Sequence, residues 1–119
     1  MLLIHEPPAS FAARQESDDD YLAAWRAYHR ALVAAGAYVD GAPLTTAASA
    51  TTVRTRDGRR FVQDGPFAEA KEQLGGFVIL DLPSLDAALS WAARCPAAAA
   101  GAVEIRPVDS GFLDAVLRD

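Results

Sequence analysis

Short apolar runs and helix-spaced apolar positions alternate along the chain. Residues 1–5 (MLLIH) form a first apolar run, which predicts a strand, and a polar, proline-rich loop follows it. Ser17 and the three aspartates after it are typical of a helix start, because a hydroxyl caps the first turn and acidic groups suit the positive end of the helix dipole. Apolar residues then recur at positions 21, 25, 28 and 32. This spacing predicts one helix that ends at Gly36.

The strongest local pattern is a hairpin in the middle of the chain. Two β-rich runs, ATTVRTR and RRFVQ, flank the Asp-Gly dipeptide at 57–58. Asp-Gly suits a two-residue type I′ turn between antiparallel strands. If this turn sets the register, Val53 faces Val62 and Arg54 faces Phe61.

The rest of the chain predicts further strands and one more long helix. GGFVILDL at 75–82 is the most apolar segment after the opening residues, so we expect it at the centre of a sheet. The remaining predicted elements are a strand over 37–44 that kinks at Gly41–Pro43, a helix over 85–94 that Ser84 caps, a strand over 102–108 and a short terminal helix.

The order of these elements predicts an α+β fold. Strand, helix, strand, hairpin, strand, helix and strand match a ferredoxin-like split β-α-β arrangement with an inserted β-hairpin. We expect one domain over residues 1–108 and a C-terminal tail over 109–119 that carries the short helix. Two helices cover only one face of such a sheet. Because the strands are apolar at many positions, we expect the other face to pair with a second copy in a homodimer.

Composition argues against several classes of function. The 119 residues carry a net charge of −5, which is unlike the clustered basic excess of a nucleic-acid-binding surface. No apolar run reaches the roughly 18–20 residues that span a bilayer, and no signal peptide is read, so we expect a cytoplasmic protein without a membrane partner. The single cysteine, Cys95, excludes an internal disulfide. Its thiol is either buried and structural or reactive.

His29 is the first candidate for chemistry. At 100° per residue it lies about 40° from Trp25, on or beside the apolar face of the predicted helix. One interpretation is a partly buried histidine whose ring a backbone carbonyl satisfies. The other is a general acid or base that a carboxylate orients. His5, in the first strand, carries the same two interpretations.

Asp64 is the second candidate, at the end of the hairpin and just before Gly65-Pro66. Its carboxylate either accepts hydrogen bonds from the following turn or stands at the mouth of a cleft, where it orients His29 or binds a substrate. Arg54 is one of four hairpin arginines, which either are solvated or hold an anionic ligand.

The chain lacks the signatures of common cofactor and metal enzymes. It contains no GxSxG, no phosphate-binding GxxxxGK, no dinucleotide fingerprint and no HExxH. Two isolated histidines do not form a convincing metal site. We therefore expect any catalysis to be acid–base chemistry without a cofactor or a metal ion.

Several segments together resemble a known family. The matching pieces are MLLI, HRAL, AAG, ATTVR, DGPFAEAKEQLGGFVIL, LDAALSWAARCPAA and GAVEIRPV, which span nearly the whole chain to Val108. They are similar to the YCII-related domain family, in its DGPF subgroup. The resemblance implies a ferredoxin-like subunit that forms a dimeric α+β barrel.

The resemblance also implies a site. Members of the wider family have been proposed as enzymes because a His–Asp pair sits in a cleft, and one relative acts as a dehydrochlorinase in chloroaromatic degradation. On this chain the histidine falls on His29 and the aspartate on Asp64, with Asp40 as a competing position. Residue 5 is a histidine where relatives carry tyrosine. The residues assigned to substrate binding are His5, Asp40, Phe67 and Arg54.

Two hypotheses on function remain open from the sequence, beside a third, structural interpretation in which the DGPF segment only ends the hairpin and shapes the dimer. The first is a cofactor-free enzyme that uses a His–Asp acid/base pair on a small organic molecule, with lyase-like or isomerase-like chemistry. The second is a non-catalytic small-molecule-binding or accessory protein. The resemblance implies a link between such an accessory protein and an extracytoplasmic-function sigma factor, because family members are often encoded beside one.

Overall fold

The predicted α+β fold is confirmed by a computed structural model, which describes residues 1–16, 19–65 and 71–118. The strands are β1 (Leu2–Glu6), β2 (Tyr38–Pro43), β3 (Thr51–Arg56), β4 (Arg59–Asp64), β5 (Gln73–Leu80) and β6 (Ala102–Ile105). The helices are α1 (Pro8–Gln15), α2 (Asp19–Ala34), α3 (Leu85–Arg94), α4 (Ala97–Ala100) and α5 (Ser110–Leu117), with a short 3-10 helix, η1 (Ala47–Ser49).

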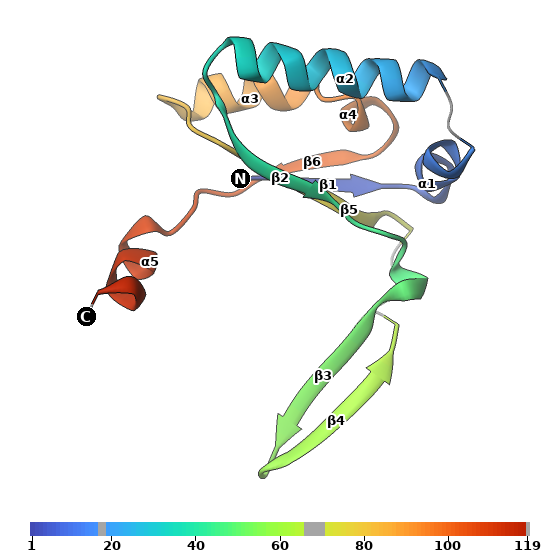
Figure 1. Ribbon diagram of the computed structural model, residues 1–119, viewed down its shortest axis with the longest axis vertical. Helices are drawn as coiled ribbons and strands as arrows, with labels where there is room; N and C mark the ends of the chain where they lie inside the picture. Colours follow the sequence, from blue (N-terminus) through green and yellow to red (C-terminus); the bar gives the residue numbers. More distant parts are fainter. Residues whose placement is uncertain (17–18, 66–70, 119) are drawn as a thin grey trace.

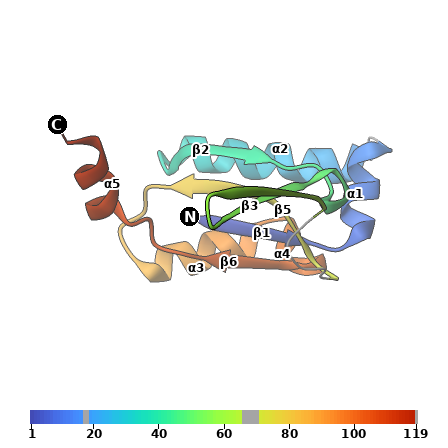
Figure 2. The same ribbon diagram turned by 90° about the horizontal axis from the view of Figure 1, so that it is seen from below.

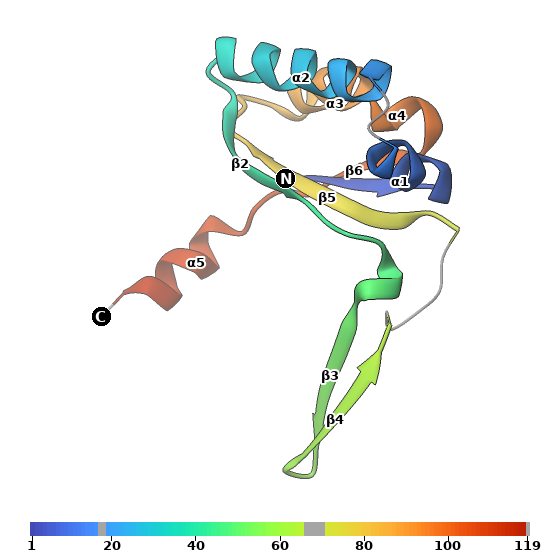
Figure 3. The ribbon, with the colours of Figure 1, turned by 45° about the vertical axis from the view of Figure 1, so that its right-hand side comes forward.

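Four strands form an antiparallel sheet in the ferredoxin-like order β2-β5-β1-β6. The apolar strand β5 lies inside this sheet, as its sequence predicts. Helices α2 and α3 lie on one face, α2 behind β2 and α3 behind β6 (Figures 1 and 2). The other face has no helix of the described residues packed on it, and the hairpin of β3 and β4 projects away on that side (Figure 3).

The core lies between the helices and the sheet. Leu2 and Ile4 of β1 belong to one buried cluster with Tyr28 and Leu32 of α2. Burial of an aliphatic side chain of this size stabilises the fold by about 1.5–3 kcal/mol. The Tyr28 hydroxyl donates a hydrogen bond to the backbone oxygen of Trp91 at 2.7 Å, which ties α2 to α3.

The predicted hairpin register is confirmed, with Val53 opposite Val62 and Arg54 opposite Phe61. Asp57 and Gly58 both have positive φ angles, 53° and 73°, as a type I′ turn requires. The projecting hairpin and α5 extend the molecule. Its radius of gyration is 16.6 Å, against about 13.5 Å for a compact domain of this length.

Two expectations differ from the structure. The segment expected as a proline-rich loop contains α1, because proline fits the first turn of a helix and because Phe11 is buried there at 4% exposure. The last strand ends at Ile105 rather than at residue 108, before Pro107, which has no N–H to donate to a ladder. The cap expected at Ser17 lies outside the described residues.

Candidate functional site

A cavity of about 520 Å³ opens between α2 and the β2–β5 half of the sheet. Tyr21, Trp25 and Tyr28 of α2 line it, together with Tyr38 of β2. Trp25 lies edge-on to both neighbouring tyrosines, with ring centroids 6.5 Å from Tyr21 and 6.0 Å from Tyr28. A cavity of this volume with mainly apolar and aromatic walls is typical of a small-molecule site.

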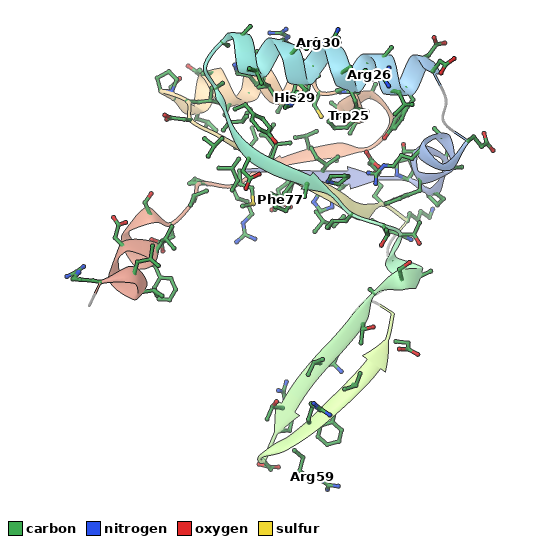
Figure 4. The ribbon with its side chains drawn as sticks, in the orientation of Figure 1. Trp25, Arg26, His29, Arg30, Arg59 and Phe77 are labelled. Atoms are coloured by element: carbon green, nitrogen blue, oxygen red, sulfur yellow. The ribbon has the colours of Figure 1, made fainter. Side chains whose placement is uncertain are left out.

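His29 lies at the rim of this cavity. It lines the cavity, its side chain is exposed, and its ring packs edge-on against Tyr38 with centroids 4.7 Å apart. Figure 4 shows His29 and Trp25 on the side of α2 that faces the sheet, whereas Arg30 lies on the opposite side. Among the described residues, none forms a hydrogen bond with either ring nitrogen. The imidazole is therefore positioned by packing, and its nitrogens are accessible to a ligand.

The hairpin residues predicted for the site lie away from this cavity. Asp64 is exposed at the end of β4, where its backbone pairs with Thr51, and it is not a lining residue. Arg54 of β3 donates a hydrogen bond to Gln63 Oε1 at 3.4 Å. Phe67 lies outside the described residues.

Two further predicted residues lie on the open face of the sheet, the face away from α2. The strand register places Asp40 opposite Ile79, and its Oδ1 accepts a hydrogen bond from the Gly41 N–H at 2.8 Å. His5 Nε2 lies 3.0 Å from Glu104 Oε1. Neither Asp40 nor Asp64 lines the cavity beside His29, so within one chain no described contact joins His29 to either aspartate. A His–Asp pair stays a prediction.

The end of the cavity farthest from His29 holds a polar cluster that the sequence analysis missed. Glu6 is fully buried, and its Oε2 accepts a hydrogen bond from Arg14 Nη2 at 2.6 Å. Its Oε1 accepts a hydrogen bond from the Tyr21 hydroxyl at 2.9 Å. Burial raises the pKa of Tyr21, so this hydroxyl stays protonated and continues to donate. A buried carboxylate requires such partners, and each oxygen of Glu6 has one.

Arg14 connects α1 to three other segments. Besides Glu6, it donates to the backbone oxygens of Leu44, at 2.7 Å from Nη1, and of Gly75, at 2.8 Å from Nη2. A Cβ at Gly75 would stand 2.8 Å from Glu6 Oε2 and 2.9 Å from Arg14 Nη2. The absence of a side chain at Gly75 therefore makes room for this ion pair.

Strand parity is the signal that reveals Glu6. Side chains alternate between faces along a strand, so residue 6 shares the helix-facing side with Leu2 and Ile4. A charged residue in that row must be buried, and hence paired. No comparable sequence pattern indicates Arg14, because its contact depends on how α1 folds back against the sheet.

Across residues 1–16, 19–65 and 71–118, no group of three or more His, Cys, Asp or Glu side chains is arranged to hold a metal ion. Within the same residues, no helix has the length and apolar character needed to cross a bilayer.

Comparisons with known proteins agree with the resemblance in the sequence. The family model of the YCII-related domain matches residues 1–110, which include every strand of the sheet and the whole cavity. A protein of Rhizobium meliloti (strain 1021), described as uncharacterised, is 36% identical over 110 residues, 91% of this chain and 89% of that protein. The chain belongs to the YCII-related domain family.

Proposed function

We propose that the protein binds a small organic molecule in the cavity beneath α2 and that His29 transfers a proton to or from it without a cofactor. The observation that supports this most directly is an imidazole at the rim of an apolar cavity, with both ring nitrogens accessible among the described residues. Histidine exchanges protons near neutral pH and is the side chain that serves most often as general acid or base.

The surroundings of His29 favour proton transfer over nucleophilic catalysis. Cys95 is buried and does not line the cavity, and burial raises the pKa of its thiol to about 11. A thiol that stays protonated is a poor nucleophile. The edge-on contact with Tyr38 limits the orientations of the imidazole, which favours a directed proton transfer. The proposal assigns no role to Asp64 or Asp40 within one chain.

The test combines ligand screening with one substitution. A library of small ketones, phenols and organic acids is screened for a rise in Tm, and each hit is followed by NMR for consumption. We expect His29→Asn to lower turnover of a consumed hit by roughly 10²–10⁴-fold, the usual contribution of general acid–base catalysis. The ligand-free Tm should not change, because the His29 side chain is exposed.

His5→Asn is the matched control. It removes the second histidine of the chain, which lies on the open face of the sheet and does not line the cavity. It should leave turnover unchanged. Unchanged turnover in His29→Asn would exclude His29 from the mechanism. Hits that raise the Tm and are never consumed would replace the enzymatic part of the proposal by non-catalytic binding.

We also infer that two copies associate through the open face of the sheet and the hairpin. The register places Leu3 opposite Phe77 on that face, and Leu74 is 42% exposed beside it. On the hairpin, Phe61 and Val62 are 50% and 57% exposed. A two-stranded ribbon is marginally stable alone in water, so a second copy that covers it would stabilise both.

A further inference from the structure

We propose that Arg14 determines ligand specificity at the far end of the cavity, where it donates a hydrogen bond to a neutral acceptor oxygen on an elongated apolar ligand of about two-ring size. This inference rests on the proposed function, because it specifies the ligand of the same cavity. Arg14 lines the cavity, and its side chain is 25% exposed.

The hydrogen bonds of Arg14 leave a donor for a ligand. A guanidinium carries five N–H groups. Three are used by Leu44 O, Gly75 O and Glu6 Oε2. The Tyr21 hydroxyl also interacts with this side chain. Even if that contact occupies a fourth N–H, one donor remains.

The charges at the Arg14 end of the cavity determine which polar group of a ligand can bind there. Glu6 balances Arg14 at 2.6 Å and is 0% exposed, so a ligand reaches the cation and not the carboxylate. The Arg14 guanidinium therefore offers a hydrogen-bond donor to a ligand, while the Glu6–Arg14 pair carries no net charge. A ketone or similar carbonyl oxygen fits it, because such an oxygen accepts a hydrogen bond and brings no charge into an apolar cavity.

The length of the cavity sets the size of the ligand. Tyr21 and His29 both line it and are eight residues apart on α2, which corresponds to about 12 Å along the helix axis. One aromatic ring is too short to contact both ends, whereas two fused rings with a substituent span most of this length. The aromatic walls formed by Trp25 and Tyr38 suit such a flat apolar body.

The test uses two probes that differ in one group. 2-Acetylnaphthalene carries a ketone oxygen, and 2-ethylnaphthalene has the same rings with a methylene in its place. Binding to the full chain is followed by tryptophan fluorescence and by NMR chemical shifts of α2. We expect the ketone to bind at least tenfold more tightly, with shifts at both Tyr21 and His29.

The matched variant is the double substitution Glu6→Gln with Arg14→Met. Removal of Arg14 alone would leave a buried carboxylate unpaired, whereas the double variant removes both charges together. It should bind the two probes with affinities within about threefold, a loss of the tenfold preference that follows from the lost charged donor. Arg30→Met, on the side of α2 that faces away from the cavity (Figure 4), should keep the preference.

Arg14→Lys serves if the double variant does not fold. It keeps a cation beside Glu6 but lacks the planar set of N–H donors, so the preference for the ketone should fall. Equal binding of both probes to the natural protein, or an unchanged preference in the variant that folds, would overturn the role of Arg14 while the cavity remains a ligand site. If neither probe binds, the ligand described here is wrong. If His29→Asn lost turnover but still preferred the ketone probe, the role of His29 in proton transfer would be separate from the role of Arg14 in ligand specificity.

Discussion

Gly75 is the residue whose missing side chain makes room for the polar end of the cavity. We expect Gly75→Ala to lower the free energy of unfolding by about 1–3 kcal/mol, because a Cβ within 2.8–2.9 Å of Glu6 and Arg14 forces a buried ion pair to move. The measurement is chemical denaturation.

Gly111→Ala is the control for this prediction. A Cβ there meets only Asp109 Oδ1 at 3.7 Å, an ordinary contact, and alanine favours a helix over glycine. This variant should be neutral or slightly stabilising. If Gly75→Ala were equally harmless, the glycine would not be required for the Glu6–Arg14 pair.

The buried thiol of Cys95 should make the free energy of unfolding depend on pH. Burial raises its pKa from 9.0 to about 11, so the folded state holds the proton more tightly than the unfolded state. Below pH 9 both states are protonated and the stabilisation is complete. As the pH rises from 9 to 11 the unfolded state loses its proton first, so the free energy of unfolding should fall by up to about 2–3 kcal/mol.

Cys95→Ala isolates this effect. The variant should start from a lower stability, because it loses buried atoms, but its stability should depend less on pH between 9 and 11. Denaturation curves at several pH values provide the comparison. Identical pH profiles for the two proteins would show that the Cys95 thiol does not titrate differently on unfolding.

At the scale of elements, the sequence predicts correctly the helices and turns whose formation depends on residues close together along the chain. The Asp-Gly turn and the hairpin register follow from local turn chemistry, and α2 follows from its apolar spacing. The cap of α3 is also correct, since Ser84 accepts a hydrogen bond from the Ala87 N–H at 3.1 Å. Helix α1 was not predicted, because the burial of Phe11 that stabilises it depends on tertiary packing.

In the candidate site, too, some residues could be predicted from local sequence patterns, and others meet only through tertiary packing. The position of His29 beside Trp25 follows from helical periodicity, and the structure places both at one cavity. The contacts of Arg14 join α1 to residues 44 and 75, far along the chain, and no periodicity encodes such a meeting. The position of Asp64 before the turn and the family resemblance both pointed to the hairpin, whereas the carboxylate beside the cavity is the fully buried Glu6, paired with Arg14.

At the scale of the whole molecule, the inferred dimer makes a measurable prediction. We expect sedimentation to show a concentration-dependent monomer–dimer equilibrium that favours the dimer. Leu74→Lys combined with Phe61→Lys should shift it toward the monomer by at least tenfold in Kd, because both substitutions place a charge on exposed apolar positions of the inferred interface. Val33→Lys on α2, a position 54% exposed, should leave the equilibrium unchanged. A natural protein that stays monomeric at high concentration would contradict the inferred association.

The position of β1 between β5 and β6 has a consequence for how the chain folds during synthesis. Leu2 pairs with Val78 on one side and with Ile105 on the other, so β1 is synthesised well before either of its partner strands. A sheet closed by such distant pairs forms slowly, because loop-closure entropy is lost before the contacts that offset it are made. A chain that stops before residue 102 would leave one edge of β1 without its partner. Chains that lack β6 should therefore aggregate through this exposed edge of β1.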